Sequence, residues 1–215
     1  MSTHKHDYDV IVVGAGHAGC EAALAAARLS CKVLLLNMGL DTVAQMSCNP
    51  SIGGLAKGHL VKEIDALGGE MATNIDATGI QYRVLNTRKG PAVRACRAQA
   101  DRWRYAERMK GVVASHPLIA LKHGVVTELL IKGNRVDGVK TREGIVFSGR
   151  AVVLTTGTFM RGLIHIGMVN YAGGRAGEPA AEGLSDYLRS IGLHVGRLKT
   201  GTPARLDKKT INFEI

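Results

Sequence analysis

Positions 14–19, Gly-Ala-Gly-His-Ala-Gly, have the composition and spacing of a phosphate-binding turn. In such a turn Gly14 permits the tight bend, Gly16 lets the backbone approach a diphosphate, and Gly19 lets the following helix pack closely on the strand. Backbone N–H groups and the positive end of the helix dipole then stabilise the diphosphate. The alternative is a structural glycine turn that binds nothing. The pattern favours a dinucleotide site made by Gly14, Ala15, Gly16, His17, Ala18 and Gly19.

Cys48 is the candidate catalytic residue, because it lies on a glycine-rich loop rather than in an apolar segment. Its thiol could act as a nucleophile if a helix start, or the nearby Lys57 or His59, lowered its pKa. The alternative is that Cys48 shapes a ligand pocket without forming a bond.

Asn37 stands at the end of the second apolar run, where dinucleotide-binding proteins usually carry an acidic residue that holds the ribose hydroxyls. An asparagine can hydrogen-bond a hydroxyl, but without the strength of a charged partner. No arginine follows directly to favour a 2′-phosphate. This departure argues against a simple NAD or NADP dehydrogenase.

The run Thr-Thr-Gly-Thr at 155–158 follows an apolar strand that comes after a β-meander. In flavoproteins with two dinucleotide sites this order builds the FAD domain, and a Thr-Gly pair, here Thr156 and Gly157, closes over the cofactor. The alternative is a hydroxyl-rich turn at a strand end. Together with the turn at 14–19, the run favours FAD.

The elements that position these residues follow from the hydrophobic pattern. Apolar strands at 8–13 and 32–36, joined by an alanine-rich helix at 17–29, predict a βαβ unit in a parallel sheet covered on both faces. Strand signals at 125–132, 135–141 and 145–147 predict an antiparallel meander before a returning strand at 151–154. The expected fold is α/β: a Rossmann-like FAD-binding domain with a parallel sheet, helices on both faces and an inserted antiparallel β-meander.

Other segments give helix and strand signals as well. Apolar residues at 60, 64 and 67 predict a helix that ends at the glycines 68 and 69. A second helix is expected from 92 to about 114, another near 182–191, and a strand at 194–199.

The expected helix from 92 to 114 would carry Arg94, Arg97, Arg104 and Arg108 on one side, where they could contact RNA phosphates. The alternative is a solvated surface. Four basic residues near the end of the chain are equal candidates: Lys199, Arg205, Lys208 and Lys209.

The composition of the chain limits which partners, metal sites and cellular compartments can be expected. The formal net charge of +10 favours a polyanionic partner.

The cysteines form no C-x-x-C pair, so we expect neither a zinc site nor any other metal site, and free thiols fit a reducing compartment. Cys20 is expected in the core, and Cys31 and Cys96 are expected to be structural. The N-terminus lacks an apolar signal region and the apolar runs are too short to span a bilayer, which favours a cytoplasmic protein without a membrane partner.

Long blocks of the sequence resemble the glucose-inhibited division protein A family, the tRNA uridine 5-carboxymethylaminomethyl modification enzymes. A sister family, the folate-dependent tRNA uridine methyltransferases, shares the early part less closely. Family members are considerably longer, so the resemblance implies an N-terminal portion: 1–204 as the first part of the FAD-binding domain, and 205–215 as the start of an inserted NAD-interacting domain. The blocks are GAGHAGCEAALAAARL, DTVAQMSCNPSIGGLAKGHLVKEIDALGG, NTRKGPAVRACRAQADR, VVLTTGTFMRGLIHIG, NYAGGRAGEP and GRLKTGTPARL.

The resemblance implies a redox enzyme of tRNA modification. FAD would mediate transfer of a one-carbon unit from methylenetetrahydrofolate to C5 of a wobble uridine, with an ammonium or glycine group added. NADH would reduce the flavin, a GTPase would be the partner protein, and the enzyme would be a homodimer.

Several positions take expected roles from the resemblance. Residues 14–19 match the family's FAD-binding stretch, and Val126 falls where a backbone contact to the adenine side is expected. Ala181 stands where some relatives carry a serine that contacts FAD, so any contact here must come from its backbone. Cys48 matches a loop cysteine near the flavin, where a thiolate could add to the uridine ring and activate the neighbouring carbon.

Two other functions stay open. One is an FAD-dependent oxidoreductase acting on small molecules, and the other is a module that binds FAD or tRNA without catalysis. If this portion is expressed alone, we expect it to bind FAD weakly and to expose apolar surface.

Overall fold

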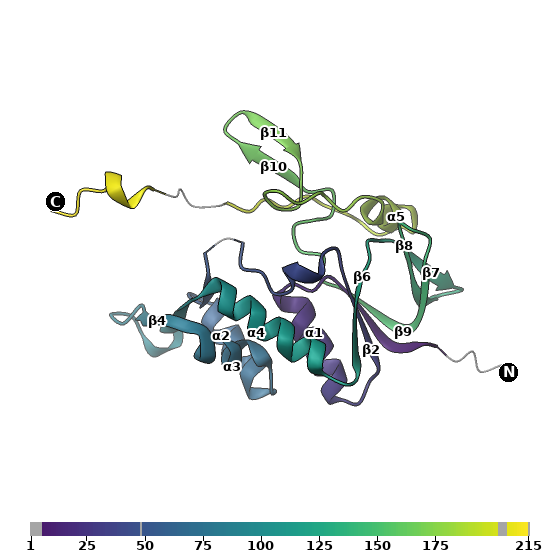
Figure 1. The fold of residues 1–215 in the computed structure, drawn as a ribbon, viewed down its shortest axis with the longest axis horizontal. Helices are drawn as coiled ribbons and strands as arrows, with labels where there is room; N and C mark the ends of the chain where they lie inside the picture. Colours follow the sequence, from purple (N-terminus) through teal and green to yellow (C-terminus); the bar gives the residue numbers. More distant parts are fainter. Residues whose placement is uncertain (1–5, 48, 202–205, 215) are drawn as a thin grey trace.

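A computed structural model describes residues 6–47, 49–201 and 206–214. Its centre is a six-stranded sheet in which the first four strands run parallel and the fourth continues with the last two as an antiparallel meander (Figure 1). This arrangement confirms the expected α/β fold. In spatial order the strands are β6 (Ile119–His123), β2 (Val33–Asn37), β1 (Tyr8–Val13), β9 (Val146–Leu154), β8 (Arg135–Thr141) and β7 (Val126–Lys132).

The expected βαβ unit opens the fold. Strand β1 leads into helix α1 (His17–Arg28), which returns the chain to β2, and the two strands pair in parallel from Val10 with Val33 to Val13 with Leu36. Helix α1 can lie close to the sheet because its buried side chains are small. They are Gly19, Cys20, Ala23, Leu24 and Ala27.

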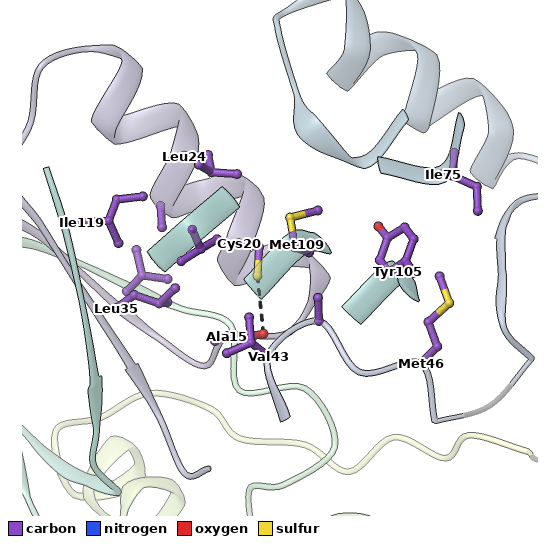
Figure 2. Close-up of a cluster of buried hydrophobic side chains, with 14 of the residues drawn as sticks. Ala15, Cys20, Leu24, Leu35, Val43, Met46, Ile75, Tyr105, Met109 and Ile119 are labelled. Atoms are coloured by element: carbon purple, nitrogen blue, oxygen red, sulfur yellow. Dashed lines mark hydrogen bonds between the residues drawn. The ribbon is translucent and has the colours of Figure 1, made fainter. Parts of the chain in front are cut away.

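Two apolar layers cover the two faces of the sheet. On one face Val12, Val33 and Leu35 pack against α1 and α4 (Arg102–Ser115). Figure 2 shows this layer, in which the Cys20 thiol donates a hydrogen bond to the Ala15 carbonyl (3.5 Å). On the other face Ile11, Val13, Leu34 and Leu36 pack against the meander and α5 (Leu184–Ser190) through Val126, Val139, Leu184 and Leu188.

Strand β9 is one continuous strand where the sequence pattern predicts two. Its first residues, 146–148, pair with β8, and its later residues, 151–154, pair with β1. The strand therefore joins the meander to the parallel sheet. Gly138 of β8 makes the close pairing possible, because a Cβ at that position would lie 2.1 Å from the Phe147 carbonyl oxygen.

The helix expected from 92 to 114 is wrong in its first half. Residues Ala95–Ala100 form strand β5, which pairs with β3 (Ser51–Gly53) and β4 (Gly79–Leu85) in a second sheet of three strands. Pairing on both edges outweighs the helix propensity of the alanines. Helix α4 begins only after Asp101, whose carboxylate accepts the N–H groups of Trp103 and Arg104 as an N-cap.

The remaining helices differ from expectation in part. Helix α2 (Lys57–Ala66) ends at the expected glycines, and Gly68 takes a φ of +83°. Helix α3 (Glu70–Thr78) and the hairpin of β10 (Leu163–Ile166) and β11 (Val169–Ala172) were not predicted from the sequence, and the hairpin projects from the body of the molecule (Figure 1). Helix α5 falls within the expected range 182–191, whereas residues 194–199 form no strand.

The described part of the chain also contains three short 3-10 helices: η1 (Leu40–Thr42), η2 (Pro91–Val93) and η3 (Lys208–Thr210). Within the described ranges, none of the helices has both the length and the apolar character needed to cross a bilayer. The same residues contain no cluster of three or more potential metal ligands.

Candidate dinucleotide site

A cavity of about 540 Å³ lies at the carboxyl ends of β1, β2 and β9, the edge at which parallel α/β sheets bind ligands. Its volume is within the usual range for ligand pockets. The fold brings most of the residues proposed for cofactor binding to this one cavity, although they come from distant parts of the chain. They are Gly14, Gly16, His17, Ala18, Asn37, Val126, Thr156, Gly157 and Ala181.

The glycines of the turn serve different physical needs. Gly14 has a φ of +101°, and a Cβ there would lie 2.5 Å from the Thr155 carbonyl oxygen. A Cβ at Gly19 would lie 1.7 Å from the Gly14 carbonyl oxygen, so this glycine allows α1 to touch the turn. A Cβ at Gly16 would meet nothing within 4 Å and would project into open space. The structure thus leaves room over Gly16, where a diphosphate would approach the start of α1.

Ala15 and Gly19 belong to the turn without lining the cavity. Both are buried, and the carbonyl of Ala15 accepts hydrogen bonds from the Ala44 N–H and the Cys20 thiol. These two residues shape the turn on its buried side, and any direct contact between them and a cofactor stays a prediction.

Asn37 braces the turn from the end of β2. Its Oδ1 accepts the Ala15 N–H (3.1 Å), and its Nδ2 donates to the Gly39 carbonyl (2.6 Å) and to Thr42 Oγ1 (3.1 Å). Both ends of the carboxamide are therefore used within the protein. An aspartate would lack the amide donor, so this network accounts for an asparagine at a place where an acidic residue is usual. The proposed contact with ribose stays a prediction.

Thr155 is a site residue that the sequence pattern did not single out. Its hydroxyl lies within hydrogen-bond distance of the Val13 carbonyl (3.0 Å) and the Gly14 carbonyl (2.8 Å). These contacts tie the end of β9 to the glycine turn. The available signal was the placement of Thr155 at the strand end directly before Thr156.

His17 and Gln45 present buried polar atoms, Nδ1 and Oε1, that have no hydrogen-bond partner among the described residues. Both residues line the cavity. Burial lowers the pKa of His17, so the imidazole stays neutral at pH 7, and its ring meets the Tyr105 ring edge-on at 5.5 Å between centroids. Buried polar atoms normally have partners, so a bound ligand or an ordered water molecule would satisfy this pair.

The opposite wall comes from residues 155–181. The Thr158 hydroxyl donates to the Gly174 carbonyl (2.8 Å) and thereby holds the glycine-rich loop at 173–177 against the strand end. Arg175 forms two hydrogen bonds to the Glu178 carboxylate (2.6 and 2.9 Å) and lies over the Phe159 ring. The sequence showed this loop but gave no reason to place it at the site.

Val126 and Ala181 reach the cavity from the meander and from the segment before α5. The Ala181 N–H donates to the Phe159 carbonyl, and the Ala181 carbonyl accepts from the Arg161 N–H. The backbone of Ala181 is thus already paired, which leaves its methyl group and one carbonyl lone pair for a ligand. The contacts implied for both residues stay predictions.

The cysteines fall into separate environments. Cys48 lies outside the described residues, but its neighbour Ser47 lines the cavity. Cys20 is fully buried, as expected, and burial raises the pKa of its thiol to about 12. Cys31 is partly buried against the core, whereas Cys96 is exposed and does not help to pack the interior.

The parallel sheet, the glycine turn with open space over Gly16, and the cavity at the carboxyl edge define a Rossmann-like protein of the dinucleotide-binding class. The family model described as glucose inhibited division protein A matches residues 9–215. The chain belongs to this family.

The relatives agree with this assignment. The chain is 67% identical over 214 residues to the tRNA uridine 5-carboxymethylaminomethyl modification enzyme MnmG of Syntrophotalea carbinolica, covering 100% of the chain and 35% of that protein. It is 70% identical over 213 residues to the protein of the same name from Pelobacter propionicus, covering 99% and 34%. A crystal structure of Aquifex aeolicus GidA superposes with a TM-score of 0.92 at 54% identity, covering 97% of this chain and 35% of that one. The chain therefore spans about a third of the length of these relatives.

Proposed function

We propose that this chain is the FAD-binding portion of an enzyme that modifies C5 of a wobble uridine in tRNA. The relatives named above carry the names of tRNA uridine modification enzymes, and they match the chain over its whole length. The observation that carries the proposal is the cavity over Gly16, because it gives this family member a place for a dinucleotide at the carboxyl edge of its sheet.

The residues present fit FAD. Room over Gly16 would admit the diphosphate, and the N-terminus of α1, with no acidic residue in its first turn, would favour the negative charge. Nδ1 of His17 and Oε1 of Gln45, which lack a partner among the described residues, would gain one, and Val126, Thr156 and Ala181 would line the remainder of the cavity. When bound, FAD supplies reversible two-electron redox chemistry. The chain's own part is to bind it, to orient it and to exclude water from the inner wall.

We propose further roles that fit the same chemistry. Methylenetetrahydrofolate would be the one-carbon donor, NADH the reductant, and a GTPase the partner of a homodimeric, cytoplasmic enzyme. Residues 205–215 would begin an inserted NAD-interacting domain. Cys48 would act near the flavin, which agrees with the position of its neighbour Ser47 on the cavity wall.

Titration of the purified protein with FAD tests the cofactor. We expect quenching of flavin fluorescence on binding, and bleaching of the flavin absorbance by NADH would show that the bound cofactor can be reduced. Unmodified tRNA, incubated with the folate donor, NADH, glycine or ammonium and the GTPase, should yield a modified wobble uridine detectable by mass spectrometry. Failure to bind FAD would refute the proposal. Flavin reduction without any change in tRNA would favour a small-molecule oxidoreductase instead.

A Cys48→Ser variant tests the proposed nucleophile. If the thiol adds to the uridine ring, tRNA modification should fall by two or more orders of magnitude while FAD binding is kept, since a hydroxyl at neutral pH is a far weaker nucleophile. Full modification activity in this variant would rule out covalent catalysis by Cys48.

A further inference from the structure

The three-stranded sheet carries two arginines directly opposite each other. Arg83 of β4 pairs with Arg97 of β5, and Gln81 pairs with Gln99 in the same register. Side chains alternate along a strand, so these four residues share one side of the sheet, called here the arginine face. Tyr82 points to the other side, where its hydroxyl donates to carbonyls of α3. The arginine face is therefore turned away from α3.

The charge on this face is not neutralised within the described part of the chain. Neither Arg83 nor Arg97 forms an ion pair there, and the side-chain contact of Arg97 is a hydrogen bond from its Nη2 to Gln99 Oε1 (3.3 Å). Arg97 is partly buried, whereas Arg83 is exposed. Like charges directly opposite each other destabilise a sheet. An anion bound between the two guanidinium groups would relieve this repulsion.

The β4–β5 connection adds positive charge beside this face, and the neighbouring strand β3 starts near the candidate cavity. The β4–β5 connection carries the exposed Arg88, Lys89 and Arg94, and residues 86–94 include no acidic residue. On the other side β5 pairs with β3, which begins four residues after Ser47 of the cavity wall. An extended chain spans at most about 3.6 Å per residue, so β3 begins within about 15 Å of the cavity rim.

We propose that the arginine face binds backbone phosphates of the RNA substrate and so holds the RNA beside the flavin cavity; this inference rests on the proposed function. Guanidinium groups bind phosphate oxygens in bidentate fashion, and glutamine amides commonly contact phosphate or ribose. None of the four residues lines the candidate cavity, and Gln81 and Arg83 are exposed on the surface of the sheet, which suits a polymer better than a small anion. The assignment replaces the arginine helix that the sequence suggested, since Arg97 lies on a strand.

The test uses the FAD-loaded protein and a synthetic RNA stem–loop with an unpaired loop, and follows binding by fluorescence anisotropy at several KCl concentrations. The variant Arg83→Gln/Arg97→Gln removes both charges of the face. Its matched control is Arg135→Gln/Arg142→Gln, which removes two charges on and next to β8, on the opposite side of the molecule from β4 (Figure 1).

We expect the arginine-face variant to bind RNA at least tenfold more weakly at low salt. The slope of log K against log salt should become shallower by about 1.4 to 1.8, because each lost phosphate contact contributes about 0.7 to 0.9. The control should change binding by less than about threefold. Removing repulsion should leave the urea midpoint of the variant no lower than that of the wild type, and its affinity for FAD should not change.

Equal loss of RNA binding in both variants would show that only total charge matters and would overturn the proposal, as would unchanged binding in the arginine-face variant. FAD binding is measured on the same samples. Loss of RNA binding with intact FAD binding supports the proposal, whereas a wild-type protein that binds this RNA but no FAD refutes the proposed flavoenzyme and leaves the arginine face as an RNA site.

Discussion

Gly16 and Gly19 lie three residues apart, yet an added methyl group would meet very different surroundings at the two positions. At Gly16 it would project into open space, and at Gly19 it would overlap the Gly14 carbonyl oxygen. We therefore expect Gly19→Ala to lower the free energy of unfolding by about 1–3 kcal/mol through overpacking. Gly16→Ala should change it by less than about 0.5 kcal/mol while weakening FAD binding at least tenfold.

Urea unfolding and FAD titration of both variants check this pair. Gly16→Ala should mainly weaken FAD binding, whereas Gly19→Ala should mainly lower the stability of the fold. A Gly16→Ala protein that binds FAD as tightly as the wild type would place the diphosphate elsewhere.

His17 provides a pH-dependent prediction. Burial lowers the pKa of its imidazole in the folded state, while the unfolded chain keeps a value near 6.5. As the pH falls below about 6.5 the unfolded state takes up a proton that the folded state does not, so His17 reduces stability in acid. The loss is at most about 1.4 kcal/mol per pH unit for one proton.

The check is a series of urea midpoints without FAD, between pH 7.5 and 5.5, for the wild type and His17→Gln. The wild type should lose stability more steeply than the variant over this range. Parallel curves for the two proteins would contradict the argument.

At the residue level, the sequence identified the site residues that belong to a local motif. The turn at 14–19, Asn37, Thr156 and Gly157 all reach one site. The sequence did not single out Thr155, Gln45 or Arg175, because their roles in the site depend on which distant segments the fold brings together at the cavity. Cofactor contacts of the predicted residues stay predictions.

At the level of elements, α3 and α4 are joined by one buried polar side chain. Asn74 is fully buried, donates to the Tyr105 carbonyl (3.0 Å) and accepts from Arg108 Nη1 (3.0 Å). Asn74→Ala would remove both of these hydrogen bonds from a buried position, although Arg108 Nη1 would keep its contact with Glu70. We expect it to lower the free energy of unfolding by about 1–3 kcal/mol.

The neighbouring Thr73 is exposed and supplies the control, since Thr73→Ala should change stability by less than about 0.5 kcal/mol. Urea unfolding of both variants compares them on the same helix. Equal stability of the two variants would mean that the hydrogen bonds of Asn74 do not help to hold α3 against α4.

The elements also show where sequence patterns fail. Continuous apolar runs predicted β1 and β2 because buried parallel strands have no alternation. The segment 95–100 reads as helix on propensity but forms β5, because β3 and β4 supply partners on both edges. Pairing with β8 and β1 likewise joins two expected strands into the single strand β9. Neither strand β5 nor the continuity of β9 follows from local composition.

At the level of the whole molecule, apolar side chains remain on the surface of the β10–β11 hairpin. Met168 is 98% exposed, Val169 67% and Ile166 65%, and the hairpin projects from the body of the molecule (Figure 1). Clustered apolar surface of this kind favours contact with another surface, whereas single exposed apolar residues are normal. We expect the protein to bind the dye ANS and to self-associate as its concentration rises.

Substitution of Ile166→Lys with Val169→Lys should remove at least about half of the ANS fluorescence and reduce self-association in sedimentation velocity. Leu29→Lys is the control, because Leu29 is 79% exposed at the end of α1, far along the chain from the hairpin. This control should leave both signals nearly unchanged, since a single apolar side chain contributes little. If Leu29→Lys lowered ANS binding as much as the hairpin variant does, the dye would be reporting general exposure or added charge. The ANS signal would then not identify the β10–β11 hairpin as the surface through which the protein self-associates.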